Sequence, residues 1–561
     1  MATNDGDDVS PAEGMAYKAK MALGSMARQR PSIRRLLANR RQEFTEAHAI
    51  LPSDATTDEQ LTLTLQAWDQ CERLVDDFRG TFVVESTDDA ATRPDQITFP
   101  ARNGGLTTVD GIAFETPGIQ YLTFTHDGTG ERFVSNPVRV TEGDPDRRLF
   151  WGDLHLHSQF SDGCGSPGQG LRFGRDVMDL DVVAYADHDT MGFFIPPRLQ
   201  RRRMERQYFP RMKEIVREFT DEGQFLPLLG YEWTQQPTVG GHVNVYFDCI
   251  EEAELFDSIS EESDTYEKLF DRLREFNDRG EGRAVAAPHH TAESSYPFDF
   301  DATDYDDEVA PLVEIYSQWG NSERPAWEGN DHPIEMGHGE AERPGHHVQD
   351  ALEMGHQVGL MASADYHDAR PGHSLLHADA HLPSLKEWRE KGLGWGLIWR
   401  IWNEPSYPGG LVGIYASELT RETVFESLRD RQVYGTSQPH RIRVEFEIND
   451  THVADSDSTV TVEGETAELQ VSITAAGTAP IERVTIVKNN EDWRVFEGTA
   501  NPEADLDTYT VEASWIDEMP ITGMTWDEAR GTDADVYYVR LKQADDGMAW
   551  AGPIWVENDD S

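Results

Sequence analysis

The alternation of apolar and polar residues divides the chain into regions of different predicted structure. Residues 1–55 combine a polar lead with an Arg-rich, helix-prone stretch. Residues 56–147 hold short alternating or β-branched runs, such as "LTLTLQAWDQ" and "GIQYLTFTHDG", which Gly, Asp and Pro turns separate. The same pattern returns over residues 441–561. Strand-length runs at this spacing are typical of β-sandwiches, so we predict a β-sandwich-like module on each side of the middle region.

Between residues 148 and 440, helix-type and strand-type segments alternate. The strand-like runs "DVVAYADHD", "QFLPLLGYEWT", "GRAVAAPHH" and "VGLMASADYHD" each follow a helix-prone segment. Repeated helix–strand units predict an α/β domain with a parallel sheet or barrel, whose functional residues lie at the carboxyl ends of the strands. Each run passes directly from apolar residues to side chains that can bind metal ions.

Composition indicates the number of domains, the salt environment and the class of partner, and it says little about activity. A chain of 561 residues is too long for one compact core, so we expect about two to four domains. Its 103 acidic and 49 basic residues give a formal net charge of −54, as in halophile proteins whose self-repulsion is screened by salt. Nucleic acid and anionic membranes bind basic surfaces, so both are disfavoured as partners.

Cysteine usage and hydropathy favour a cytoplasmic protein. The cysteines Cys71, Cys164 and Cys249 are few and far apart, which suits a reducing compartment rather than a disulfide scaffold. The N-terminus has neither the basic start nor the apolar run of a signal peptide. No apolar stretch approaches the roughly 18–20 residues that a membrane-spanning helix needs. The oligomeric state is left open.

The first histidines of the middle region lie in "GDLHLHSQFSDG", residues 152–163. Alternate side chains of a strand share a face, so His155 and His157 would point one way and Leu154 and Leu156 the other. Two converging neutral imidazoles suit a metal ion. Alone, the pair is more simply interpreted as two surface histidines, so a metal site requires further ligands elsewhere in the chain.

Residues of the right type follow at the ends of later apolar runs. In chain order they are Asp162, Asp187, His188, Asp189, Glu232, His242, His289, His290, Glu314, Asp365 and His367. An ordered set of this kind is hard to attribute to a random polar surface. The sequence therefore predicts a metal centre built from successive strand ends.

The ordered motifs "DLHLHSQFSDG", "ADHD", "GYE", "PHH" and "SADYH" resemble those of the PHP (polymerase and histidinol phosphatase) superfamily. The resemblance covers residues 148–440, and the flanking β-regions are similar to a poorly characterised branch known mainly as a domain of unknown function. It implies an α/β fold, a distorted (β/α)7 barrel flanked by N- and C-terminal β-sandwich modules. It also implies two or three bound divalent ions, of Zn, Mn or Fe.

The resemblance also implies how the ligands divide among three metals. The first metal would be held by His155, His157, Glu232 and Asp365. Glu232 would bridge to a second metal, which His242 and His289 also hold. The third would be held by His188 and His367 with Asp162. His289 is preferred to its neighbour His290, and the choice between them depends on where the strand ends.

Four further residues are candidates for catalysis beside the metals. Asp187 and Asp189 flank His188 and could orient metal-bound imidazoles, or simply cap turns. Arg370 and His373, in "HDARPGHS", directly follow the last motif and could reach a substrate anion or its leaving group. Glu314 ends the run "APLVEIYS" and is a candidate partner of a ligand.

Several nearby residues are interpreted first as structural. The histidines expected on solvated loops or a helix surface are His332, His338, His346, His347 and His356. The arginines expected in helix salt bridges, with substrate contact as the second interpretation, are Arg421, Arg429 and Arg431. The tryptophans expected to pack a helix or loop, with the lining of a substrate pocket second, are Trp395, Trp399 and Trp402.

The predicted activity is metal-dependent hydrolysis of small-molecule phosphate esters, with a metal-bridging hydroxide as nucleophile. The sequence contains neither a Gly-rich phosphate-binding loop nor a GxSxG motif, so a nucleoside triphosphatase and a serine hydrolase are disfavoured. A carboxyl-ester, carbamate or amide hydrolase with the same centre is one alternative. A non-catalytic, metal-containing binding protein is another. A structural metal site is usually closed by four ligands, so the surplus of candidates favours catalysis.

Overall fold

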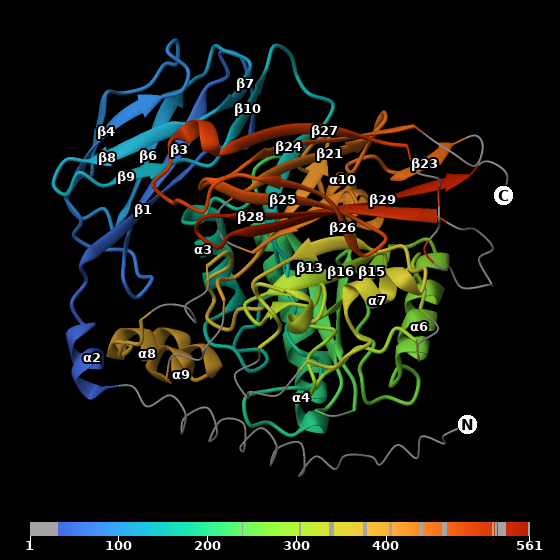
Figure 1. Cartoon of the computed structure of the whole chain (residues 1–561). Helices are drawn as coiled ribbons and strands as arrows, with labels where there is room; N and C mark the ends of the chain where they lie inside the picture. Colours follow the sequence, from blue (N-terminus) through green and yellow to red (C-terminus); the bar gives the residue numbers. More distant parts are fainter. Residues whose placement is uncertain are drawn as a thin grey trace.

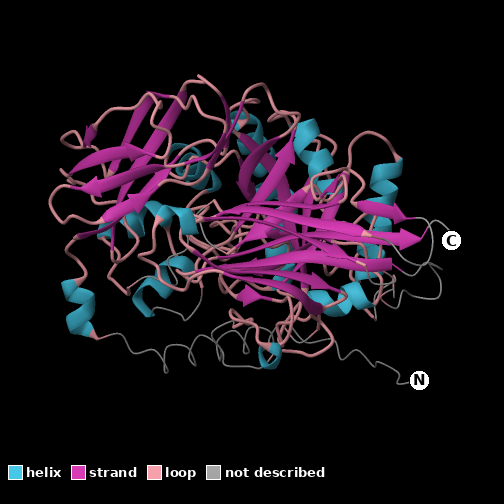
Figure 2. Ribbon diagram, turned by 45° about the horizontal axis from the view of Figure 1, so that its top comes forward, coloured by secondary structure: helices cyan, strands magenta, loops and turns pink. Residues whose placement is uncertain are grey.

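The computed structural model describes residues 32–558, apart from 238, 302–304, 336–341, 374–378, 403–406, 438–440, 463–467, 519–520, 522–523 and 525–533. Strands predominate in this part of the chain, and the helices lie mostly around their periphery (Figure 2). Among the described residues, no helix combines the length and the apolar character that crossing a bilayer requires.

The N-terminal strands form three small sheets around one apolar core (Figure 1). The elements are α2 (Ile33–Ala38), β1 (Phe44–Ile50), β2 (Asp54–Thr56), β3 (Leu61–Asp69), β4 (Thr81–Ser86), β5 (Gln96–Thr98), β6 (Leu106–Ile112), β7 (Gly118–Gln120), β8 (Leu122–His126), β9 (Arg132–Val134) and β10 (Val138–Thr141). They pair in the orders β1-β3-β6, β2-β10-β7 and β5-β4-β8-β9. The region is β-sandwich-like, and its first two strands start inside the stretch 1–55 that was expected to be helical.

The middle region supplies most of the helices. Its elements are β11 (Arg148–Asp153), α3 (Pro167–Asp176), β12 (Val182–Tyr185), α4 (Pro197–Arg203), the π-helical turn η1 (Met204–Tyr208), α5 (Phe209–Phe219), β13 (Leu226–Thr234), β14 (His242–Phe247), α6 (Tyr266–Asp278), β15 (Ala284–His289), β16 (Leu312–Ser317), β17 (Gly320–Asn321), η2 (Ala326–Glu328), α7 (Val348–Glu353), β18 (Gly359–Ala362), α8 (Leu385–Lys391), α9 (Trp395–Trp402), β19 (Leu411–Ala416), α10 (Arg421–Arg429) and β20 (Val433–Thr436). α5 illustrates why these helices form, because Met212, Ile215 and Phe219 recur at helical spacing and are all buried.

The C-terminal region is almost entirely strand. It comprises β21 (Arg443–Ile448), β22 (Thr451–His452), β23 (Thr459–Val462), β24 (Leu469–Ala476), β25 (Ile481–Lys488), β26 (Glu491–Glu497), η3 (Leu506–Thr508), β27 (Thr510–Asp517), β28 (Ala534–Gln543) and β29 (Met548–Asn558). Four of these strands form a separate sheet in the order β22-β21-β24-β27. The others join the sheet of the middle region, so the expected boundary at residue 441 separates strands that share one sheet.

The predicted (β/α)7 barrel is wrong. Among the described residues, 15 strands make one large sheet in which β17-β16-β15-β14-β13-β12-β11-β19-β20 continue into β29-β28-β25-β26. β14 pairs antiparallel with both β13 and β15, and β19 pairs antiparallel with β11. Antiparallel neighbours need no crossover helix, so the helix–strand alternation breaks where β13 leads straight into β14. The middle region is therefore part of a mixed sheet rather than a closed barrel.

The pairing directions bring the candidate ligands to one edge of the large sheet. β11, β12 and β13 are mutually parallel neighbours, as are β15, β16 and β18, so within each set the carboxyl ends meet. β14 runs the opposite way and therefore reaches this edge with its first residue. In the register of the sheet, His242 lies opposite Thr234 on one side and His289 on the other. Sheet geometry, rather than chain proximity, assembles the site.

Candidate metal centre

The segment that follows β11 points two imidazoles toward one spot. Leu156 forms a parallel bridge with Tyr366, and the His157 N–H donates to the Tyr366 carbonyl at 2.9 Å. Leu154 and Leu156 are fully buried in the apolar core. The Nε2 atoms of His155 and His157 lie 3.1 Å apart, as strand alternation predicted.

Two carboxylates complete this first group. Oε2 of Glu232 lies 3.1 Å from Nε2 of both His155 and His157. Oδ1 of Asp365 lies 3.0 Å from His157 Nε2 and 3.6 Å from His155 Nε2. Asp365 has a backbone φ of 52°, a left-handed conformation that non-glycine residues adopt mainly at turns and functional sites. These are the four residues implied for the first metal.

The second oxygen of Glu232 faces a different set of ligands. Its Oε1 lies 2.6 Å from His242 Nδ1, 3.1 Å from His188 Nδ1 and 3.3 Å from His289 Nε2. A carboxylate whose two oxygens face separate groups of imidazoles has the geometry of a bridging ligand.

Both residues of the His289–His290 pair face the centre. His290 has a φ of 35°, which turns the chain directly after β15. Ligand atoms of His242, His289 and His290 all lie within 4.8 Å of one another. The choice between His289 and His290 was expected to depend on where the strand ends. β15 ends at His289, and the turn after it brings both histidines into the cluster.

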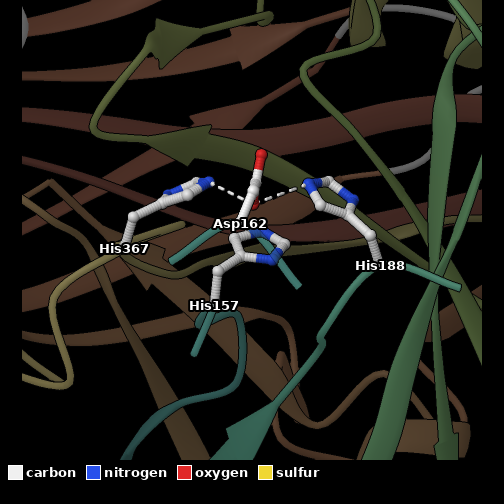
Figure 3. Close-up of side chains that lie close together, drawn as sticks. All are labelled: His157, Asp162, His188 and His367. Carbon is white, nitrogen blue, oxygen red and sulfur yellow. Dashed lines mark ion pairs between the residues drawn. The ribbon is translucent and has the colours of Figure 1, made fainter. Parts of the chain in front are cut away.

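A third group gathers around Asp162 (Figure 3). Oδ1 of Asp162 lies 3.4 Å from His367 Nε2 and 3.5 Å from His188 Nε2. Ligand atoms of these three residues and His157 lie within 4.8 Å of one another. His157 and His188 each belong to two of the groups, so the groups are contiguous.

Residues outside the ligand set hold the ligands in place. Both Glu314 oxygens lie 3.1 Å from Nδ1 of His155, which leaves Nε2 of that ring directed at the cluster. The Trp319 indole N–H donates to Asp365 Oδ2 at 2.7 Å. Glu314 was a candidate partner from its sequence, whereas the sequence signal for Trp319 was no more than its place in the short turn between β16 and β17.

Asp187 and Asp189 lie beside His188 in the sequence, but they accept hydrogen bonds from the segment after β11, the end of β13 and the loop at Ser258. Asp187 accepts hydrogen bonds from the Ser158 N–H at 2.7 Å and the Ser161 hydroxyl at 2.6 Å. Asp189 accepts from the backbone N–H groups of Thr234 at 3.0 Å and Ser258 at 2.6 Å. Both carboxylates order the segments that carry the ligands.

The structure does not bring Arg370 and His373 to the cluster. Arg370 donates to the Glu72 carbonyl and lies over the Trp68 ring, 5.7 Å from its centroid. His373 Nε2 lies 2.7 Å from a Glu72 carboxylate oxygen, and its ring packs edge-on against Trp68 at 4.3 Å. Both side chains contact the N-terminal region. They therefore join the middle region to the N-terminal region and do not lie where a substrate was expected to bind.

The remaining candidates also differ in detail from expectation. His346 and His347 are buried, where exposed positions were expected; His346 Nδ1 lies 2.7 Å from the Phe298 carbonyl oxygen. His332 stacks on Tyr407, and His356 packs against Tyr305. Arg421, Arg429 and Arg431 contact respectively the Pro227 carbonyl, Asp430 and the Trp555 ring. His338 and the Trp402 side chain lie outside the described residues.

The buried charges of the centre perturb one another. Burial alone would raise the pKa of Glu232, but His188, His242 and His289 hold it well below its ordinary range. Burial and the neighbouring His155 lower the pKa of His289 to about 3. Burial lowers the pKa of His157, but its hydrogen bonds with Asp365 and Glu232 outweigh burial and raise that pKa to about 10, so a divalent cation bound here would displace a proton from this ring.

A second observation, the hydrogen bonding of the buried imidazoles, also indicates that these side chains could bind a cation. Nε2 of His242 and Nδ1 of His290 are buried without a hydrogen-bond partner among the described residues. Buried polar atoms normally have partners, and imidazole nitrogens without one are ready metal ligands. The cluster therefore has the chemistry and the geometry to hold more than one metal ion.

Comparison with known proteins places the chain among proteins without assigned activity. The family described as "Protein of unknown function (DUF3604)" matches residues 177–329 and 340–489. An uncharacterised protein of Chlamydia trachomatis is 25% identical over 456 residues, which are 81% of this chain and 64% of that protein. One of Chlamydia pneumoniae is 24% identical over 462 residues, with the same coverage. The alignment thus spans less than two thirds of the length of these relatives.

Solved structures add no argument about fold or function. A β-glucuronidase of Parabacteroides merdae aligns over 92% of this chain and 65% of its own, with 8% identity and a TM-score of 0.19. The D0-D1 domain of intimin aligns over 21% of this chain and 60% of its own, with 12% identity and a TM-score of 0.16.

Proposed function

The chain belongs to the DUF3604 family of proteins of unknown function, and we propose that it is a metal-dependent hydrolase of phosphate esters. The observation that carries the proposal is the position of Glu232, whose two carboxylate oxygens face separate groups of imidazoles. A single closed structural site would need only four ligands, whereas the contiguous groups supply enough donors for two or three ions with positions left for substrate.

Divalent ions at this centre would supply an activated water near neutral pH and would neutralise the charge that develops on the substrate. The residues of the chain bind and orient. His155 is oriented by Glu314, and Asp365 is held by the indole N–H of Trp319. Glu232 and His155 are fully buried, so the side chains around them exclude bulk water and strengthen every electrostatic contact.

Phosphate esters are proposed as substrates on the resemblance of the ligand order to the PHP superfamily. The resemblance concerns the ordered ligands and not the barrel, because the described residues of this region form a mixed sheet instead. Phosphoryl transfer requires neutralisation of several negative oxygens, and a cluster of cations meets this requirement.

Metal content and hydrolysis, measured on one preparation, test the proposal. The full chain is purified in molar KCl, its bound Zn, Mn and Fe are counted, and turnover of p-nitrophenyl phosphate, bis-p-nitrophenyl phosphate and p-nitrophenyl acetate is assayed. We expect about two or three ions per chain and phosphoester turnover. Glu232→Gln keeps the size of the side chain but removes the bridging charge, and should lose both metal and turnover.

The matched control is His126→Ala, which removes a buried histidine of the N-terminal region. This variant should keep the metal content and turnover of the wild-type protein. Turnover of the acetate alone would replace the phosphoesterase by a carboxyl-ester hydrolase with the same centre. Wild-type protein without bound metal would overturn the ligand assignment itself.

A further inference from the structure

A row of aromatic side chains begins at the metal ligands. The ring centroids of His367 and Trp399 lie 5.0 Å apart, those of Trp399 and Trp395 5.9 Å, and those of Trp395 and Phe194 5.7 Å. The planes of the two tryptophan rings differ by only 15°. Trp319, which holds Asp365, packs edge-on against Trp399 at 5.4 Å.

The row runs from the buried centre to the surface. His367 is 5% exposed, Trp399 and Trp395 are half-buried, and Phe194 is 49% exposed. Phe194 also has a φ of 54°, a conformation that is strained for a bulky side chain. Backbone strain of this kind clusters at active sites and ligand-binding sites. The exposed ring of Phe194 is also no part of the apolar core, and it is connected to the buried centre through the row.

The helix that carries the tryptophans is fixed close to the ligands. A Cβ atom added at Gly396 of α9 would collide with the carbonyl oxygen of His367. Arg400 of this helix and Lys391 at the end of α8 both pair with buried Asp368. Both charges are thus already matched by a buried carboxylate, and the described side chains of the row itself are aromatic.

We propose that Trp399, Trp395 and Phe194 bind the organic group of the substrate, and that this group is an aromatic ring. The inference rests on the proposed function, because the metals would hold the phosphate end of the ester. Flat, nearly parallel indole faces favour a planar ring by stacking, whereas a small, flexible glycerol phosphate has no flat face to lie against them. The row therefore determines specificity and takes no part in the chemical step.

Two substrates and two variants test the proposal. We expect Phe194→Ala and Trp395→Ala to lower kcat/KM for 1-naphthyl phosphate by about tenfold, the size of one lost aromatic contact, and to leave glycerol 2-phosphate nearly unchanged. Trp395→Phe keeps a ring and should retain most of the preference. The control is Trp327→Ala, which removes a 65% exposed tryptophan outside the row.

An equal loss on both substrates, or no loss on either, would overturn the proposal. Phe194 is exposed enough that its variant should fold even where Trp395→Ala does not. Calorimetry of naphthylphosphonate binding, with methylphosphonate as the ligand that has no ring, distinguishes failure of this inference from failure of the proposed function. A wild-type protein that hydrolyses neither ester refutes the hydrolase. The row is refuted if wild type and Phe194→Ala bind naphthylphosphonate equally.

Discussion

Single carboxylates determine how this centre is organised. Glu232 contributes one oxygen to each of two imidazole groups, while both oxygens of Glu314 lie 3.1 Å from Nδ1 of His155. The first arrangement would join two metal ions, and the second fixes which nitrogen of a ligand faces them. Two glutamates on separate strands of one sheet, β13 and β16, thus have different parts in one site.

The orienting part of Glu314 yields a prediction at this scale. Glu314→Gln keeps the shape of the side chain but weakens its hold on His155 Nδ1, so we expect metal affinity to fall by about 10–100-fold. Competition with a chelator of known affinity measures the change. Glu308→Gln, at an exposed position shortly before β16, serves as the control. Unchanged affinity in Glu314→Gln would mean that other contacts orient the ring.

At the scale of elements, the pair α8–α9 is attached to the site through Asp368. This fully buried carboxylate pairs with Lys391 at 2.7 Å and with Arg400, and it accepts from the Tyr366 hydroxyl at 3.0 Å. The residue immediately follows the ligand His367. The helix α9, which carries Trp395 and Trp399, is therefore anchored one residue away from the candidate ligand His367.

Removal of this anchor should be costly. Asp368→Ala leaves Lys391 and Arg400 buried without their shared counter-charge, so we expect the free energy of unfolding to fall by about 3–5 kcal/mol. Denaturant titration measures it. Glu214→Ala, which breaks an exposed pair with Arg211 on α5, should cost no more than about 1 kcal/mol. Similar losses in the two variants would show that the Asp368 network contributes little.

At the scale of the whole molecule, a buried ion network joins the N- and C-terminal regions. Arg443 of β21 pairs with Glu445 at 2.5 Å and with Asp54 of β2 at 3.1 Å. Burial alone would raise the pKa of Glu445, but Arg443 and His452 hold it well below its ordinary range. The carboxylate therefore stays ionised, and stabilises the junction, at all pH values above that range.

Acid should weaken this junction. Because the pKa is lowered in the folded state, the stabilisation is complete above the ordinary glutamate value and is lost as pH falls below it. We expect the difference in unfolding free energy between wild type and Glu445→Gln to be largest near neutral pH and to shrink below about pH 4.3. Glu447→Gln, at an exposed position on the same strand, is the control. A difference that does not vary with pH would contradict the prediction.

The sequence by itself determined the candidate ligands, because each lies where an apolar run gives way to polar residues, as at His155, Glu232 and Asp365. Such a junction is a local property of the sequence, so it can be recognised even when the predicted fold is wrong. Strand direction is not local: the residues of β14 are compatible with either pairing, and contacts with β13 and β15 decided it.

Only the tertiary structure could separate the ligands from their neighbours in the chain. Arg370 and His373 follow the last motif as closely as a catalytic residue would, yet Glu72, some three hundred residues earlier, holds both. Trp319 and Phe194 escaped notice for the same reason, since their partners Asp365 and Trp395 come from distant parts of the chain. Residue type and local pattern specify what a side chain can do, whereas long-range packing decides what it meets.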